Sequence, residues 1–168
     1  IVENFVTEVQ DHHPAIMDDL PGLVTEYNDT LGLSRMFSVR MLSLKSMVGR
    51  DYKILAQILP FILVRHLSEV RQPNDIVSIF VMLGKMCSLV FVRRIVGDFD
   101  SYVQMVHQSV VDLLHGIDAY DTAHATRNGY TPVILKPKAH LLIHLADNIR
   151  KFDPALNFET EKGEQYNK

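Results

Sequence analysis

The sequence predicts an all-α fold, a single-domain helical bundle of about six or seven helices. Apolar residues recur at three- and four-residue spacing along nearly the whole chain, which is the period of a helix that buries one face. Proline, glycine and Asn or Asp residues interrupt this pattern and mark helix ends. The sequence has no clear run of alternating apolar and polar residues, which half-buried strands would produce. With 168 residues, the chain is long enough for one domain with a substantial core.

Composition and charge narrow the functional class. The chain is 47% hydrophobic and 22% charged, which is typical of a globular protein rather than a disordered one. Its net charge of −3 argues against a dedicated non-specific DNA-binding domain, because such domains are usually basic. Cys87 is the only cysteine, so the sequence excludes an internal disulfide framework and a cysteine-based zinc site. Its apolar surroundings in the sequence predict a buried, inert thiol.

The first 67 residues are expected to form four helices, at residues 1–10, 15–31, 34–48 and 51–67. Pro14 follows the break after the first helix, and Pro21 interrupts or restarts the second. Ser34 is a suitable N-cap for the third. Pro60 lies inside the fourth helix and is expected to kink it.

The second half is expected to form three helices, at residues 76–92, 98–119 and 138–152. The first is apolar enough to suggest a membrane span, but it has only 17 residues, with Gly84 and Lys85 at its centre. A spanning helix needs about 20 mostly apolar residues, so we expect instead a helix buried on nearly all sides. Residues 120–136 read as a long loop with a turn at Asn128-Gly129.

The predicted helices that follow have defined inner faces. For residues 98–119 the inward residues are Tyr102, Val103, Val106, Val110, Leu113, Leu114 and Ile117. For residues 138–152 they are Leu142, Leu145, Ile149 and Phe152. Asp153-Pro154 stops the last helix. Residues 158–168 could begin another, although Gly163 weakens that prediction.

Two histidines and a basic group are the first candidates for chemistry. His140 and His144 lie four residues apart, so they project from one helix face and could bind one zinc ion. Leu141 stands where a zinc protease needs glutamate, which excludes that class. The pair is therefore interpreted as histidines packing at a helix interface, close to the acidic tail. The four basic residues around this helix could contact DNA phosphates or form a solvated face: Lys136, Lys138, Arg150 and Lys151.

The C-terminal segment carries the most specific pattern. Residues 137–145 read Pro-Lys-Ala-His-Leu-Leu-Ile-His-Leu, and an Ile-Arg-Lys-Phe-Asp-Pro-Ala turn follows. Residues 158–167 then read Phe-Glu-Thr-Glu-Lys-Gly-Glu-Gln-Tyr-Asn. This order resembles the C-terminal part of large transposon-encoded proteins of fungi, related to CACTA-type (EnSpm-like) transposases. The resemblance covers the chain from about residue 42 to its end, and only the tail is specific.

The resemblance implies a role for the acidic tail. Transposases with a ribonuclease-H-like core hold two divalent metals with three acids, and in several superfamilies a helical insertion precedes the third. Residues 1–157 resemble that insertion, and residues 158–168 the start of the helix that bears the acid. Glu164 matches the final glutamate of the family pattern, Glu161 is the runner-up and Glu159 the third choice. Gly163 departs from the pattern, where an aromatic residue precedes that glutamate.

The remaining expectations follow from the same resemblance. The chain begins at Ile1 rather than Met, and we expect a fragment that is inactive alone, with an upstream catalytic domain supplying the other two acids. Mg²⁺ or Mn²⁺ and transposon DNA would bind only to the full-length parent, which would be intracellular, and nuclear if it is a functional transposase. No cofactor in the fragment and no membrane contact are expected, and oligomerisation is left open. The alternative is a non-catalytic helical interaction module from a decayed transposon gene.

Overall fold

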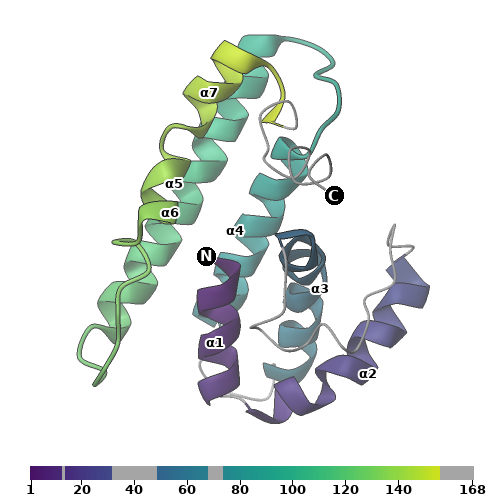
Figure 1. The fold of residues 1–168 in the computed structure, drawn as a ribbon, viewed down its shortest axis with the longest axis vertical. Helices are drawn as coiled ribbons and strands as arrows, with labels where there is room; N and C mark the ends of the chain where they lie inside the picture. The colour runs from purple at the N-terminus through teal and green to yellow at the C-terminus, as the bar shows by residue number, and fades with distance from the viewer. Residues whose placement is uncertain (13, 32–48, 68–73, 156–168) are drawn as a thin grey trace, which may run out of the picture. The chain divides into compact units, whose positions relative to one another are not determined.

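The computed structural model describes residues 1–12, 14–31, 49–67 and 74–155, and these confirm the all-α prediction (Figure 1). They form seven helices and no strand: α1 (Val2–His12), α2 (Pro14–Leu31), α3 (Gly49–Leu67), α4 (Asn74–Val90), α5 (Phe99–His124), α6 (Pro137–Leu142) and α7 (Leu145–Phe152). The helix predicted over residues 34–48 lies outside the described residues. None of the described helices is both long and apolar enough to cross a membrane.

The chain divides into two compact units, Ile1–Phe80 and Val81–Lys168, with the boundary inside α4. In the first unit α1, α2 and α3 pack against one another in every pair. Phe5 of α1 meets Phe80 of α4 edge to face, with ring centroids 6.2 Å apart. Pro14 begins α2, which continues through Pro21, whereas Pro60 lies inside α3 as expected.

The core of the first unit is made of aliphatic and aromatic side chains at helical spacing. Between Leu55 and Leu63, α3 contributes a buried apolar face on both sides of Pro60. This burial explains why the proline-containing segment stays helical, because packing stabilises a helix more than propensity does. The fully buried large side chains of the unit are Phe5, Leu20, Leu55, Ile58, Leu59, Ile62, Leu63, Ile79 and Phe80.

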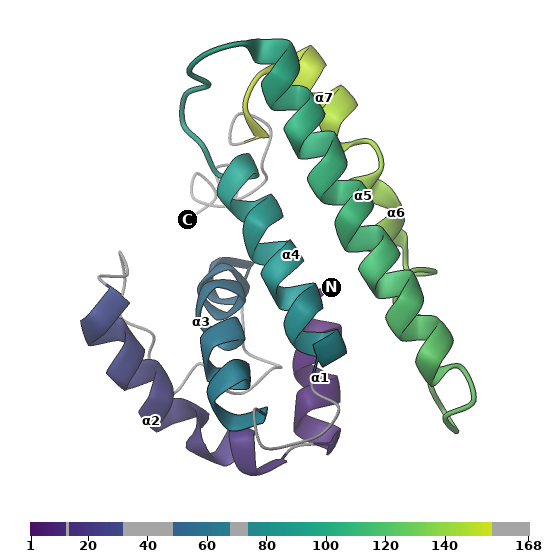
Figure 2. The ribbon, with the colours of Figure 1, turned by 180° about the vertical axis from the view of Figure 1, so that it is seen from behind.

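The second unit is built on α5, the longest described helix. Its buried face contains six of the seven side chains predicted to point inward, and the seventh, Leu114, is half-buried. Helices α6 and α7 follow one another back along α5, as both ribbon views show (Figures 1 and 2). Tyr102 of α5 donates its hydroxyl to the Leu89 carbonyl at 2.9 Å, which ties α5 to the end of α4.

Three expectations about these helices are wrong. α4 is not buried on nearly all sides, because Ser78, Val81 and Lys85 are exposed while Ile79, Phe80, Leu83, Met86 and Val90 are buried. α5 extends to His124 instead of ending near residue 119, since the buried Tyr120 and Asp121 continue its inner face. Cys87 is half-buried rather than buried, because it lies at the edge of the inner face of α4.

The N-terminus of α5 is fixed by Asp98, whose carboxylate accepts the Ser101 backbone N–H at 2.8 Å. This bond satisfies one of the N–H groups that a helix start leaves without a partner. Gly97 precedes the cap with φ of 101°, a conformation that glycine adopts without strain. Hydrogen bonds from Ser101, through its side chain and its backbone, lower the pKa of the Asp98 carboxyl below 3.8.

Asp98→Ala should lower the thermal midpoint near pH 7, because the Ser101 N–H loses its acceptor. Because the pKa of Asp98 is lower in the folded state, its ionised carboxylate stabilises the helix at any pH above the ordinary pKa. This stabilisation is lost as the pH falls through the lowered pKa of the folded state. The gap in midpoint between wild type and Asp98→Ala should therefore narrow from about pH 7 to about pH 3. Circular dichroism melts measure it. Asp98→Asn is the control, since an amide also caps but does not titrate. A gap that stays constant with pH would contradict the assignment.

Candidate functional site

Helices α6 and α7 carry most of the sequence-predicted site residues that the structure describes. Lys136 precedes α6, and Pro137 occupies its first turn. Ala139, Ala146 and Ile149 are buried, and contacts between α7 and α5 show where this face packs. The inner face thus combines two alanines with the larger, fully buried Ile149. Sequence periodicity had instead placed Phe152 inward, and it is 57% exposed.

The predicted continuous helix over residues 138–152 is divided between α6 and α7. The backbone N–H of Ile143 is bonded to the His140 carbonyl, and that of His144 to the Leu141 carbonyl, so the chain tightens between the two helices. His144 then becomes the N-cap residue of α7.

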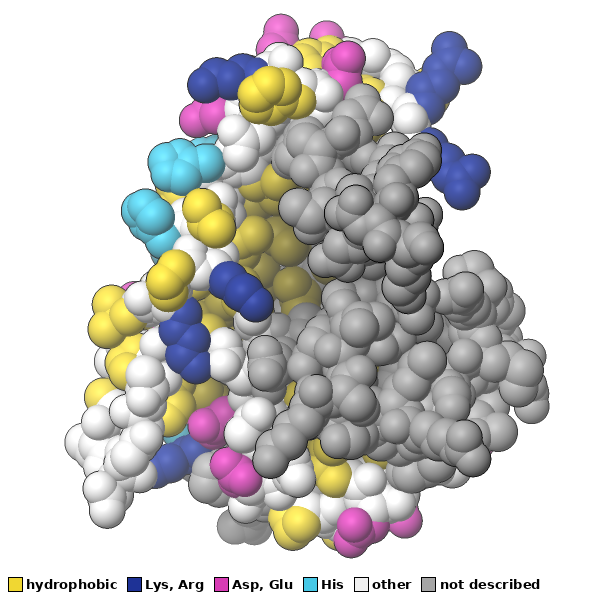
Figure 3. All heavy atoms as spheres, viewed as in Figure 1, with side chains coloured by type: hydrophobic (Ala, Val, Ile, Leu, Met, Phe, Trp, Pro, Cys, Tyr) yellow, Lys and Arg dark blue, Asp and Glu magenta, His cyan; other side chains and the backbone are white. Residues whose placement is uncertain are grey.

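His140 and His144 lie together on the outer side of this segment. Their ring centroids are 5.5 Å apart and the ring planes are nearly perpendicular, at 82°. Both side chains are exposed, and Figure 3 shows histidine side chains at the surface on the face where α6 and α7 lie. Packing at a helix interface, the role inferred from the sequence, is therefore wrong.

The predicted acidic site falls on residues that the structure does not describe. Glu159, Glu161 and Glu164 all lie beyond residue 155, so the assignment of a metal-binding acid stays a prediction, as does the closeness of the histidine pair to the acidic tail. Within the described part of the chain, no group of three or more His, Cys, Asp or Glu residues is placed to hold a metal ion.

The four predicted phosphate-contacting residues do not form one patch. Lys136 and Lys138 lie at the start of α6, whereas Arg150 and Lys151 occupy the last turn of α7. The two helices follow one another along α5, so at 1.5 Å per residue the pairs are separated by roughly 20 Å. Each pair therefore needs its own phosphate if both contact DNA.

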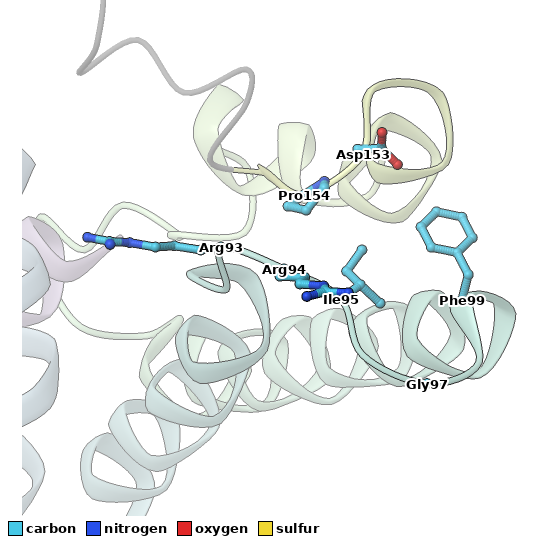
Figure 4. Close-up of a pocket in the computed structure, with 7 residues that line it drawn as sticks. All are labelled: Arg93, Arg94, Ile95, Gly97, Phe99, Asp153 and Pro154. Carbon is cyan, nitrogen blue, oxygen red and sulfur yellow. The ribbon is translucent and has the colours of Figure 1, made fainter.

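A shallow hollow of about 320 Å³ lies where α7 ends beside the linker between α4 and α5. Figure 4 shows Asp153 and Pro154 on one side, Ile95 and Phe99 facing them, and Arg93 extending away from Asp153. Arg150, near the same end of α7, lies 4.0 Å from Asp100, and both side chains are largely exposed. Acidic and basic side chains are therefore mixed at this end of the unit.

A buried acid, Asp121, fixes the loop before α6. The sequence predicts this residue within the loop, whereas the structure places it on α5. Asp121 is 4% exposed on the last turns of α5. Its Oδ1 accepts the Val133 N–H at 3.0 Å and its Oδ2 the Ile134 N–H at 2.8 Å. The Tyr130 hydroxyl also donates to Oδ1. These bonds satisfy the buried carboxyl and fix the loop, so the group has a structural role.

Three aromatic rings lie together at the end of α5 and in the loop that follows it. Tyr120 and His124 stack with ring centroids 4.0 Å apart, and His124 Nδ1 lies 2.8 Å from the Tyr120 carbonyl oxygen. Tyr130 packs beside both rings. One feature of the sequence could have predicted the burial of Asp121. Tyr120 and Asp121 lie one helical turn after Ile117 and so continue the inner face of α5. The Asn128-Gly129 turn was predicted correctly, with Gly129 at φ of 78°.

The chain was compared with models of protein families, with curated proteins and with solved structures, and none of them matches it.

Replacing Asp121 with Ala should lower the free energy of unfolding by about 2–4 kcal/mol, because two backbone N–H groups and a phenol lose their buried acceptor. Asp121→Asn should cost less, since one oxygen remains, although its NH₂ group would meet an N–H donor. Urea unfolding measures both. Asp118→Ala, an exposed acid on the same helix, should stay within about 0.5 kcal/mol of wild type. Equal effects at the two positions would contradict the anchoring role.

Asp153 ends α7 with φ of 64° and ψ of −159°, a region that only glycine adopts without strain. Asp153→Gly should therefore raise the free energy of unfolding by about 1 kcal/mol. Asp153→Ala removes the same carboxylate but keeps a Cβ, so it should give no such gain. Thermal or urea unfolding distinguishes them. If both substitutions stabilise the protein to the same degree, the gain comes from removing the carboxylate and not from relieving backbone strain.

Proposed function

We propose that this chain is the helical insertion region of a transposase-like protein, followed by the segment that carries the third metal-binding acid of a DDE-type DNA strand-transfer site. The observation that carries the proposal is the order of elements. Helices account for the described units, and the last of them, α7, ends at Phe152, six residues before the Phe158-Glu159-Thr160-Glu161 segment begins. The resemblance of residues 137–168 to transposon-encoded proteins supports the same order.

The chemistry requires a carboxylate at this place in the chain. Mg²⁺ and Mn²⁺ prefer oxygen ligands, and two such ions about 3.5–4 Å apart can activate a water or a 3′-hydroxyl and stabilise the leaving oxygen of a phosphodiester. Glu164 would be a metal ligand and not a nucleophile. One carboxylate cannot hold two ions, so the proposal places the other two acids in an upstream ribonuclease-H-like domain. The fragment alone is then inactive, and the functional protein acts in the nucleus.

The second candidate function is a non-catalytic helical interaction module. Leu135, Leu141 and Ile143 are 77%, 63% and 49% exposed, and all three belong to the segment that returns along α5. Large apolar side chains gathered at a surface are typical of protein contact sites. In this case the helices would serve association, and the acids of the tail would be solvated.

Glu164→Gln in the full-length parent protein should abolish cleavage of transposon-end DNA in Mg²⁺ or Mn²⁺ while DNA binding is retained, because the amide no longer supplies an anionic metal ligand. Gel-based cleavage and binding assays on the same preparations measure the two properties. Asp147→Asn, which alters an exposed acid on α7, is the matched control and should cleave normally.

Two outcomes change the assignment. Normal cleavage by Glu164→Gln together with loss in Glu161→Gln would move the ligand by one helical turn. Normal cleavage by the single Gln variants at 159, 161 and 164 would remove the catalytic interpretation of the tail. The interaction module would then be the better account.

A further inference from the structure

His140 and His144 form a paired-imidazole surface whose geometry suits one transition-metal ion. An imidazole nitrogen binds such an ion at about 2.0–2.1 Å, and structural sites favour tetrahedral angles. Two rings that bind one ion in this way have centroids roughly 5 Å apart. In the structure the centroids are 5.5 Å apart, which is close to the separation that such a site requires.

The surroundings leave this pair accessible. Both rings are exposed, and the side chains between them on the outer surface, Leu141 and Ile143, are apolar and do not compete for the imidazole nitrogens. Among the described residues no third His, Cys, Asp or Glu is placed to complete a metal site with this pair. Two protein ligands leave coordination positions open, unlike the four ligands of a closed structural zinc site.

We propose that His140 and His144 bind a first-row transition-metal ion, of the Ni²⁺, Cu²⁺ or Zn²⁺ class, and so bridge the break between α6 and α7. Imidazole nitrogen suits these ions, and the affinity of a nitrogen site rises from Ni²⁺ to Cu²⁺. His140 belongs to α6 and His144 caps α7, so the ion joins the two helices through side chains where helical backbone bonds are interrupted. The site is separate from the carboxylate site proposed for the tail and does not depend on it.

Isothermal titration of the tag-free 168-residue protein with Ni²⁺ tests the proposal. One ion per chain is expected, and the thermal midpoint should rise with Ni²⁺, because an ion that binds the folded state preferentially stabilises it. His140→Ala and His144→Ala should each weaken binding at least about tenfold, a loss that even supporting residues of metal sites can produce. Both side chains are exposed, so these variants should keep the wild-type helical circular dichroism.

Two kinds of control make the test specific. His115→Ala on α5, an exposed histidine outside the pair, and Cys87→Ser should bind Ni²⁺ as wild type does. The double variant Leu141→His/His144→Ala keeps the number of histidines but puts the two in adjacent positions, which do not face each other on a helix. It should bind at least about tenfold more weakly than wild type.

Three results would overturn the proposal. The first is the absence of Ni²⁺ binding by the wild-type chain. The second is unchanged affinity in the double variant His140→Ala/His144→Ala, which would place the ion elsewhere, such as at the adjacent His12 and His13. The third is wild-type affinity in the Leu141→His/His144→Ala variant, which would show that the spacing of the two rings is irrelevant.

Discussion

The carboxyl group of Asp121 determines how the second unit closes. It receives two backbone N–H groups and a phenol from the returning loop, and all of them lie 9–13 residues further along the chain. Without an acceptor at this point, the Val133 and Ile134 N–H groups would be left without partners next to the core. Because the loop is fixed there, α6 starts at a defined place, and the positions of Ala139, Ala146 and Ile149 on the inner face follow from it.

Much of the fold could be predicted because it follows from apolar periodicity. The inner face of α5 and the helix around Pro60 needed only local spacing, whereas the interruption or restart predicted at Pro21 is wrong, because α2 continues through it. The break at Ile143 and His144 could not be predicted, since the apolar residues of the segment continue through it. The buried carboxyl of Asp121 was missed for a related reason. An acid is ordinarily placed at the surface, and only its distant partners show that burying it costs little.

The candidate site was less predictable than the fold. Sequence spacing brought His140 and His144 together correctly, because residues four apart share a helix face. Whether the face with His140 and His144 is buried or exposed depends on which side of α6 and α7 packs inward. Ala139 and Ala146 are buried together with Ile149, although sequence hydrophobicity favoured Leu145 and Phe152. The two basic pairs were treated as one group because they flank one predicted helix, although the length of that helix already places them roughly 20 Å apart.

Two proposed metal sites in one small protein can be distinguished by the chemistry of their ligands. The tail offers carboxylate oxygens, which hold hard ions such as Mg²⁺, and that site needs acids from another domain. The α6–α7 surface offers imidazole nitrogens, which bind Mg²⁺ poorly and Ni²⁺ or Cu²⁺ well. Binding of a transition metal by this chain would therefore not support strand-transfer chemistry. Failure of the isolated chain to bind Mg²⁺ would likewise not argue against strand-transfer chemistry in the full-length parent. Each site has to be judged with its own ion and in its own context, the isolated chain for the histidines and the full-length parent for the glutamates.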